Sequence, residues 1–145
     1  NALVGAGTVT TAQQVRDIKA AGGQIIISPH LDDNVVCEAV NLGLISMPGV
    51  ATPTEAFRAI ALGAHGLKLF PAEMISPSVV KSMRAVLPGH VRLIPVGGIG
   101  AHNMANYRQC GASGFGIGSA LYAPGKTVQA IGESAAAFVR AWHDV

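Results

Sequence analysis

The sequence predicts a single α/β domain with a parallel β-sheet. Short apolar runs, typical of buried strands, alternate with amphipathic helical patterns along all 145 residues. Strict alternation of strand and helix is typical of parallel sheets. Half of the chain is apolar, which is enough for a sizeable core. Because successive strands begin only about 20 to 26 residues apart, no room remains for a second domain, and we treat residues 1–145 as one unit.

Helix boundaries in the first half of the chain carry clear signals. Glycine follows each expected helix, at Gly22, Gly43 and Gly63, where it favours termination. Thr52 can cap a helix whose first turn holds Pro53 and Glu55, the pattern of a capping box. We therefore expect three strand-helix units here, with strands Ala2–Gly5, Gln24–Ser28 and Leu44–Met47 and helices Thr11–Ala21, Asp33–Leu42 and Pro53–Leu62.

The second half repeats the alternation. Gly66 and Pro71 bound a short apolar run, and Gly111 ends a helical pattern before the next run. Bounded runs of this length are typical of buried strands. The expected strands are Gly66–Phe70, Val91–Val96 and Gly114–Ile117, and the expected helices are Ser76–Leu87, Ala101–Cys110 and Thr127–Trp142.

Composition excludes several classes of function. Charged residues make up only 12% of the chain, the net charge is +2 and no basic run occurs, so a nucleic-acid partner is not expected. No apolar run reaches the roughly 18 to 20 residues of a membrane span. Cys37 and Cys110 have no metal-binding spacing, which favours a reduced, cytoplasmic setting. The chain begins with Asn1 rather than Met, and we expect it to be a piece of a longer product.

Two architectures can satisfy a parallel sheet of this kind. A doubly wound sheet that binds a dinucleotide is disfavoured, because the run Gly5-Ala6-Gly7 has Thr10 where the third glycine should fall, and no acidic residue follows for a ribose. The alternative is a closed (β/α)₈ TIM barrel, which needs about 200 residues or more. The six units expected here are two short of that number.

Lys68 is the candidate for chemistry. It lies inside an apolar run, and burying an unpaired ammonium is costly. A lysine whose pKa is lowered by desolvation becomes a nucleophile toward carbonyls. The alternative, a strand-end lysine that reaches solvent or pairs with a carboxylate, has similar weight from this stretch alone.

Small residues follow the last two expected strands and suggest an anion site. Gly97 and Gly98 come after one strand, and Gly118 and Ser119 after the next. Glycines let backbone amides approach an anion closely, and barrel enzymes commonly bind phosphate after their last two strands. Ser119 has no visible partners for a nucleophilic triad, so a phosphate contact suits it better.

The remaining polar residues give weaker signals. The histidines show no metal spacing, and we expect solvent-exposed imidazoles, with only His30 near the active face. The lysines on helices and loops are expected to be solvated surface residues, namely Lys19, Lys81 and Lys126.

Six motifs together resemble those of the 2-keto-3-deoxy-6-phosphogluconate/6-phosphogalactonate aldolases. They occur in the family's order and approximate spacing across essentially the whole chain. The motifs are Val4-Gly5-Ala6-Gly7-Thr8-Val9, Ile27-Ser28-Pro29, Pro48-Gly49-Val50-Ala51-Thr52-Pro53-Thr54-Glu55, Leu67-Lys68-Leu69-Phe70-Pro71-Ala72, Val96-Gly97-Gly98-Ile99 and Gly118-Ser119.

The resemblance implies a class I, metal-independent aldolase on a (β/α)₈ barrel, usually a homotrimer, with no cofactor. Such an enzyme cleaves a phosphorylated keto-deoxy sugar acid of carbohydrate metabolism into pyruvate and glyceraldehyde 3-phosphate. By motif, Lys68 matches the Schiff-base lysine, and Thr8 and Pro29 match positions that hold the pyruvate carboxylate. The phosphate contacts correspond to Gly97, Gly98, Gly118 and Ser119. Val96, which precedes the glycine pair, resembles the galactonate-specific members, where the gluconate enzymes typically have threonine.

One part of the family pattern has no counterpart. The family's general-base glutamate and carboxylate-binding arginine lie on and just after the second strand, whereas this sequence begins at what resembles the third. We therefore expect strands 3 to 8 of the barrel, without the first two units, and exposed sheet edges that favour self-association. Glu55 is not a substitute base, because its capping position turns it to its own helix. The alternatives are a phosphate-binding barrel fragment without turnover, or another phosphate-binding barrel enzyme such as an epimerase or isomerase.

Overall fold

The computed structural model describes residues 2–143, in which six helices alternate with short strands. The helices lie close to the expected positions. In chain order the elements are β1 (Gly5–Ala6), α1 (Ala12–Ala20), β2 (Ile25–Ile27), α2 (Asp33–Asn41), β3 (Ile45–Met47), β4 (Gly49–Val50), α3 (Pro53–Ala61), β5 (Gly66–Leu69), α4 (Pro77–Val86), β6 (Arg92–Pro95), α5 (Met104–Gln109) and α6 (Val128–His143).

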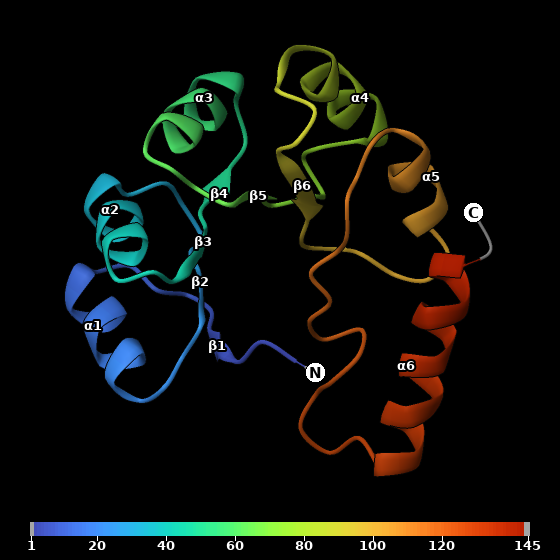
Figure 1. The fold of residues 1–145 in the computed structure, drawn as a ribbon. Coiled ribbons are helices and arrows are strands. Elements are labelled where there is room, and N and C mark those ends of the chain that lie inside the picture. The colour runs from blue at the N-terminus through green and yellow to red at the C-terminus, as the bar shows by residue number, and fades with distance from the viewer. Residues whose placement is uncertain (1, 144–145) are drawn as a thin grey trace.

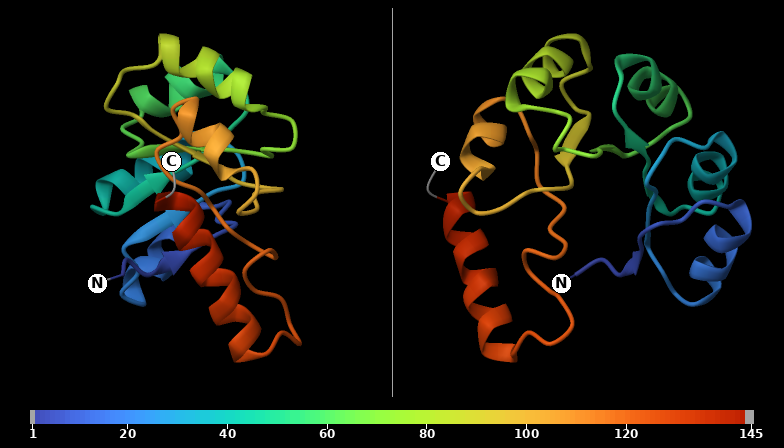
Figure 2. Two further views of the ribbon diagram at one scale, coloured as in Figure 1. Left: turned by 90° about the vertical axis from the view of Figure 1, so that its right-hand side faces the viewer. Right: turned by 180° about the vertical axis from the view of Figure 1, so that it is seen from behind.

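The strands form a curved parallel wall with the helices along its outer side (Figures 1 and 2). Strands β1, β2 and β3 pair in that order, as do β4, β5 and β6. Pro48 separates β3 from β4, and its carbonyl accepts the Lys68 amide at 2.9 Å. The two short strands are therefore one extended segment, whose first half pairs with β2 and whose second half pairs with β5.

The wall is open, in keeping with the six strand-helix units expected of an incomplete barrel. Within residues 2–143 the sheets end at β1 on one side and at β6 on the other, and no pairing joins these ends. The α/β alternation is confirmed, but six consecutive units cannot complete a ring that requires eight.

The last predicted strand, Gly114–Ile117, is also reduced. It makes a single bridge between Val96 and Gly116, supported by hydrogen bonds from Ser113 N to Leu93 O at 2.8 Å and from Gly116 N to Pro95 O at 3.0 Å. Glycine weakens a strand interior, and the segment has a ladder partner on one side only within the described residues. The first predicted strand, Ala2–Gly5, is observed as Gly5–Ala6 instead.

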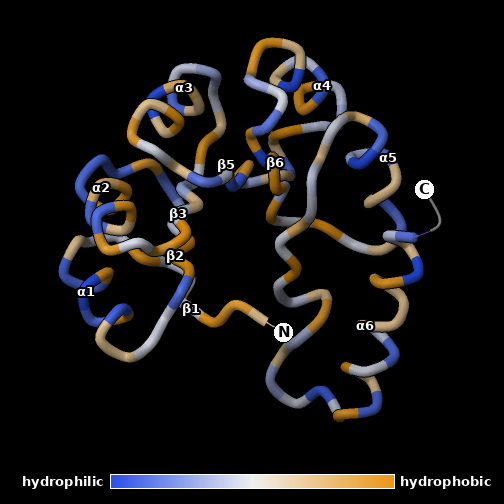
Figure 3. The backbone as a smooth tube through the Cα atoms, viewed as in Figure 1, coloured by the Kyte–Doolittle hydropathy of each residue, from blue (hydrophilic) through white to orange (hydrophobic). Residues whose placement is uncertain are grey.

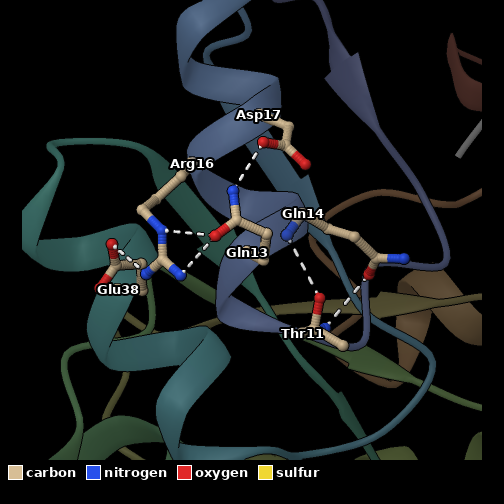
Figure 4. Close-up of polar contacts among 6 residues, drawn as sticks. All are labelled: Thr11, Gln13, Gln14, Arg16, Asp17 and Glu38. Carbon is tan, nitrogen blue, oxygen red and sulfur yellow. Dashed lines mark hydrogen bonds and ion pairs between the residues drawn. The ribbon is translucent and has the colours of Figure 1, made fainter.

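Side chains cap the first turns of α1 and α3, and the cap at α3 is the one that the sequence predicts. Thr11 and Gln14 form a capping box at α1, and Thr52 and Glu55 form another at α3 (Figure 4 shows the first). Figure 4 also shows Arg16 of α1, whose guanidinium lies 3.1 Å from Glu38 Oε1 of α2. Caps of this kind contribute about 1 kcal/mol each, whereas an exposed ion pair contributes less.

Two buried apolar clusters lie between the wall and its helices. The larger packs β4 to β6 against α3, α4 and α5, and includes Leu67, Leu69, Val80 and Leu93. The smaller, with Val15, Ile26 and Val35, joins β1 to β3 with α1 and α2. Strands β2 and β6 are mostly hydrophobic along the tube in Figure 3. Across residues 2–143, no helix is long and apolar enough to span a membrane.

Candidate active site

Lys68 lies in the middle of β5 and is only 9% exposed. Side chains alternate along a strand, so Leu67 and Leu69 pack into the outer cluster while Lys68 faces the inner side of the wall. The backbone there is fixed on both sides, since Lys68 pairs with Gly49 of β4 and with Ile94 of β6. The sequence prediction of a lysine inside a buried parallel strand is confirmed.

An apolar cavity of about 400 Å³ surrounds the inner side of Lys68. Successive strands each contribute to its wall, and the segment after α5 closes it. The lining residues are Ile27, Met47, Lys68, Ile94, Val96, Gly114, Phe115, Gly116, Ile117 and Gly118.

The Lys68 ammonium has no carboxylate partner among the described residues, whose two ion pairs join Arg16 to Glu38 and Arg58 to Asp33. Its nearest recorded neighbour is the Phe70 ring, with Nζ 3.9 Å from the ring centroid. Desolvation by burial lowers the pKa of Lys68, because an apolar surrounding penalises the charged form. The ion-paired alternative is therefore wrong, and the environment favours a reactive amine.

A second pocket, of about 360 Å³, adjoins the Lys68 cavity. The two share Val96, Gly116 and Gly118, so Val96 lies on the boundary between them. All four residues expected to bind phosphate line this second pocket. Its lining is Val96, Gly97, Gly98, Ile99, Gly100, His102, Gly116, Gly118, Ser119 and Ala120.

The glycine pair after β6 has a conformation that other residues rarely adopt. Gly97 has φ 107° and Gly98 has φ 62°, both in the region that favours glycine. A Cβ at Gly97 would also collide with Glu73 Oε2, and one at Gly98 would lie 3.0 Å from Glu73 Cγ. The amides of Gly97 and Gly98 have no hydrogen-bond acceptor within residues 2–143, so both are free to donate to an anion.

Ser119 lies in a single turn after the bridge to β6. The Gly118 carbonyl accepts from Leu121 N at 2.9 Å and from Tyr122 N at 3.1 Å. The expectation that Lys126 is a solvated surface lysine is wrong. Its Nζ donates to the carbonyls of Ala120 at 2.9 Å, Leu121 at 3.3 Å and Ser119 at 3.4 Å.

Thr8 and Pro29 lie just after β1 and β2, at the same end of the wall as the two pockets, but they line neither. Thr8 is exposed and has φ 58°, the one positive φ outside glycine among the described residues. Such a conformation is a genuine outlier for a β-branched residue and costs on the order of 1 kcal/mol. Outliers of this kind cluster at functional sites.

Glu55 is committed to its helix, as expected. Its carboxylate accepts from Ala51 N and Thr52 N, each at 2.9 Å, and from Thr52 Oγ1 at 2.7 Å. These bonds, led by that from the Ala51 amide, lower the pKa of Glu55. A carboxylate held in this way is a poor proton acceptor.

The histidines differ in part from expectation. His102 lines the pocket of Gly97 and Ser119 while remaining exposed, whereas His30 lines neither pocket. Sequence spacing offered no signal for His102, because only the turn after Gly100 brings it to the pocket. Over the part of the chain that the structure describes, no group of three His, Cys, Asp or Glu side chains is placed to hold a metal ion.

Comparisons with known proteins agree on one family. The model of the family described as "Aldolase: KDPG and KHG aldolase" matches residues 1–133. A probable 2-dehydro-3-deoxy-6-phosphogalactonate aldolase of Rhizobium meliloti is 43% identical over 99% of this chain and 68% of its own length. The 2-dehydro-3-deoxy-6-phosphogalactonate aldolase of Escherichia coli is 41% identical over 99% and 70%.

Solved structures give the same result. A native KDPGal structure superposes with a TM-score of 0.96 at 40% identity, covering 99% of this chain and 69% of that one. KDPG aldolase from Legionella pneumophila, with pyruvate captured at low pH as a covalent carbinolamine intermediate, has a TM-score of 0.76 at 28% identity. That match covers 98% of this chain and 66% of the Legionella chain.

Proposed function

Because the chain belongs to the KDPG and KHG aldolase family, we propose that it is a class I aldolase for 2-keto-3-deoxy-6-phosphogalactonate. The products are pyruvate and glyceraldehyde 3-phosphate. We also propose a homotrimeric assembly, for which the apolar groove between α3 and α4 offers the exposed side chains of Val79 and Val86.

A single observation carries the proposal. Lys68 is a buried, unpaired lysine whose cavity adjoins a pocket lined by the four expected phosphate contacts. Desolvation lowers the pKa of Lys68, which increases the neutral, nucleophilic fraction at neutral pH. A substrate with a keto group near one end and a phosphate at the other matches this pair of adjoining sites.

The chemistry follows from the amine. Lys68 Nζ attacks the C2 carbonyl carbon to form a carbinolamine, which loses water to give a protonated imine. When the C4 hydroxyl loses its proton to a base, the C3–C4 bond breaks and its electron pair moves into the imine. Glyceraldehyde 3-phosphate leaves, and the enamine is protonated at C3 and hydrolysed to pyruvate and the free amine. Covalent catalysis of this kind replaces one difficult step by easier ones.

The scheme assigns a part of the substrate to each group of residues at this end of the wall. Thr8 and Pro29 are proposed to bind the pyruvate carboxylate, and the pocket of Gly97, Gly98, Gly118 and Ser119 to bind the phosphate. Val96 lies between the two groups of contacts and is proposed to select between the galactonate and gluconate epimers at C4.

The rival function is phosphate binding without turnover. The observation that favours it is the state of Glu55, whose three hydrogen bonds remove it as the base for the C4 hydroxyl. The two functions agree on phosphate binding and differ on whether Lys68 forms an imine and whether the C3–C4 bond then breaks.

Borohydride reduction in the presence of pyruvate separates the two. We expect a reduced pyruvate adduct on Lys68, located by mass spectrometry, and none in Lys68→Met. Lys81→Met, which removes an exposed lysine of α4, is the matched control and should trap pyruvate normally. Absence of the adduct would remove the aldolase mechanism and support the rival, whereas trapping without cleavage of the phosphorylated sugar acid would show imine formation on Lys68 but refute turnover.

A further inference from the structure

Asn103 occupies the N-cap position of α5 but makes no capping bond with its side chain. Asparagine at this position normally accepts from an amide of the first helical turn. Here Asn103 Nδ2 donates to Gly98 O at 2.9 Å, and Asn103 Oδ1 accepts from Gly100 N at 3.1 Å. The carboxamide thus closes the Gly98–Gly100 segment of the phosphate pocket into a ring.

Lys126 binds the second loop of the pocket, the turn that contains Ser119, as Asn103 binds the first. Its ammonium donates to three successive carbonyls, those of Ser119, Ala120 and Leu121. No carboxylate pairs with it within residues 2–143, so the lysine is committed to the backbone of this turn. Neither Asn103 nor Lys126 lines the pocket itself.

These contacts bear on a general difficulty of anion sites that are built from backbone groups. Every peptide unit that offers an N–H group also carries a carbonyl oxygen, whose lone pairs repel a phosphate. The Gly98 carbonyl accepts from Asn103, and the Ser119 and Ala120 carbonyls accept from Lys126, two residues that do not themselves line the pocket. The amides of Gly97 and Gly98 remain without acceptors among the described residues. Preorganised donors of this kind bind without a cost of rearrangement.

We propose that Asn103 and Lys126 are positioning residues of the phosphate pocket, each holding the carbonyls of one loop away from the anion. The inference rests on the proposed function of that pocket as the site of the substrate phosphate. Neither side chain contacts the phosphate in this scheme, and both act through the backbone.

Four variants test the proposal. Asn103→Ala removes both bonds to the Gly98–Gly100 segment, and Asn106→Ala is its control, because Asn106 is an exposed asparagine of the same helix. Lys126→Met removes the three bonds to the turn, and Lys126→Arg restores donors and charge. Lys81→Met again serves as the control for loss of a surface lysine.

The measurements are the affinities for inorganic phosphate and glyceraldehyde 3-phosphate by calorimetry, and borohydride trapping of pyruvate on Lys68. We expect Asn103→Ala and Lys126→Met each to weaken both phosphate affinities by about ten-fold or more. Pyruvate trapping, which needs no phosphate, should stay within about two-fold of wild type. Lys126→Arg should recover most of the affinity, and both control variants should bind as wild type does.

The outcomes separate this inference from the proposed function. Wild-type affinity in Asn103→Ala and Lys126→Met, or equal losses of phosphate binding and pyruvate trapping, would overturn the positioning role. A wild type that binds phosphate but traps no pyruvate would remove the aldolase mechanism, while the affinities still decide the role of the two residues. A wild type that binds no phosphate would overturn the inference directly.

Discussion

Replacing Val96 by threonine should shift the substrate preference from the galactonate toward the gluconate epimer. Three residues line both the Lys68 cavity and the phosphate pocket, namely Val96, Gly116 and Gly118. Since two of them are glycines, Val96 alone of the three has a side chain. Its backbone is fixed by bonds from Val96 N to Leu69 O at 3.0 Å and from Ala72 N to Val96 O at 2.9 Å. Threonine has nearly the same shape as valine, so the substitution changes polarity without moving the wall.

The size of the effect follows from what a hydroxyl adds at this boundary. The two substrates differ at C4, which is one end of the C3–C4 bond that breaks in the proposed mechanism. A hydrogen bond to the correctly oriented C4 hydroxyl contributes about 0.5 to 1.5 kcal/mol, and a buried hydroxyl left unpaired with the other epimer costs about 1 to 3 kcal/mol. We therefore expect the ratio of kcat/KM for the two epimers to change by about 1 to 3 kcal/mol, or roughly five-fold to 150-fold.

The assay is kcat/KM for both epimers with wild type and Val96→Thr, measured by coupled detection of pyruvate. Wild type should prefer 2-keto-3-deoxy-6-phosphogalactonate modestly, because an apolar wall discriminates by shape alone. Val96→Ala serves as a control that enlarges the site without adding a hydroxyl. A wild type that prefers the gluconate epimer, or a ratio that Val96→Thr leaves unchanged, would show that Val96 is not the selector.

Two further predictions concern Lys68 and Thr8. Burial lowers the pKa of Lys68 below its ordinary value of 10.5. Between the lowered pKa of the folded chain and 10.5, the unfolded chain therefore binds more protons than the folded one. The free energy of unfolding, relative to that of Lys68→Met, should rise as the pH is raised toward 10.5. A pH-independent difference in urea unfolding free energy would contradict this. Thr8→Asn should stabilise the fold by up to about 1 kcal/mol by relieving the positive φ while weakening pyruvate trapping, whereas Thr8→Ser should keep trapping; a destabilised Thr8→Asn or a normal trapping yield in it would refute the assignment.

Local signals predicted much of the fold. The capping box at Thr52 and the apolar run around Lys68 depend on residues close in sequence, and the helices begin within a few residues of the expected positions. The segment Gly114–Ile117 was predicted as a strand from its composition, but a strand exists only through its neighbours, and it has one bridge. Strand pairing is a property of tertiary structure that no local pattern contains.

The supporting residues of the site were harder to predict for a different reason. The expected helix Ala101–Cys110 places Asn103 inside the helix, whereas the observed helix begins at Met104. A lysine in a polar loop predicts a solvated side chain, so the role of Lys126 had no local signal either. The glycine pair is predicted to contact a phosphate, and Gly97 and Gly98 do line a pocket. The same two glycines are also required by their positive φ and by Glu73, which packs against them. The loop conformation is therefore enough to explain glycine at positions 97 and 98. The evidence for an anion site is the pair of free amides and the pocket that they line.

The site combines two environments with opposite requirements. An amine nucleophile needs a dry, apolar surrounding that lowers its pKa, and Lys68 has it among Ile27, Met47 and Ile94. A phosphate needs hydrogen-bond donors, and in the proposed site the backbone loops after β6 and after the bridge would supply them, since the pocket lining, within residues 2–143, holds no lysine, arginine or carboxylate. A cationic side chain close to Lys68 would lower its pKa further, whereas a carboxylate would raise it and restore the unreactive ammonium. If backbone groups bind the phosphate as proposed, the pKa of Lys68 is left to desolvation alone, and Val96, which lines both pockets, stands between the two environments.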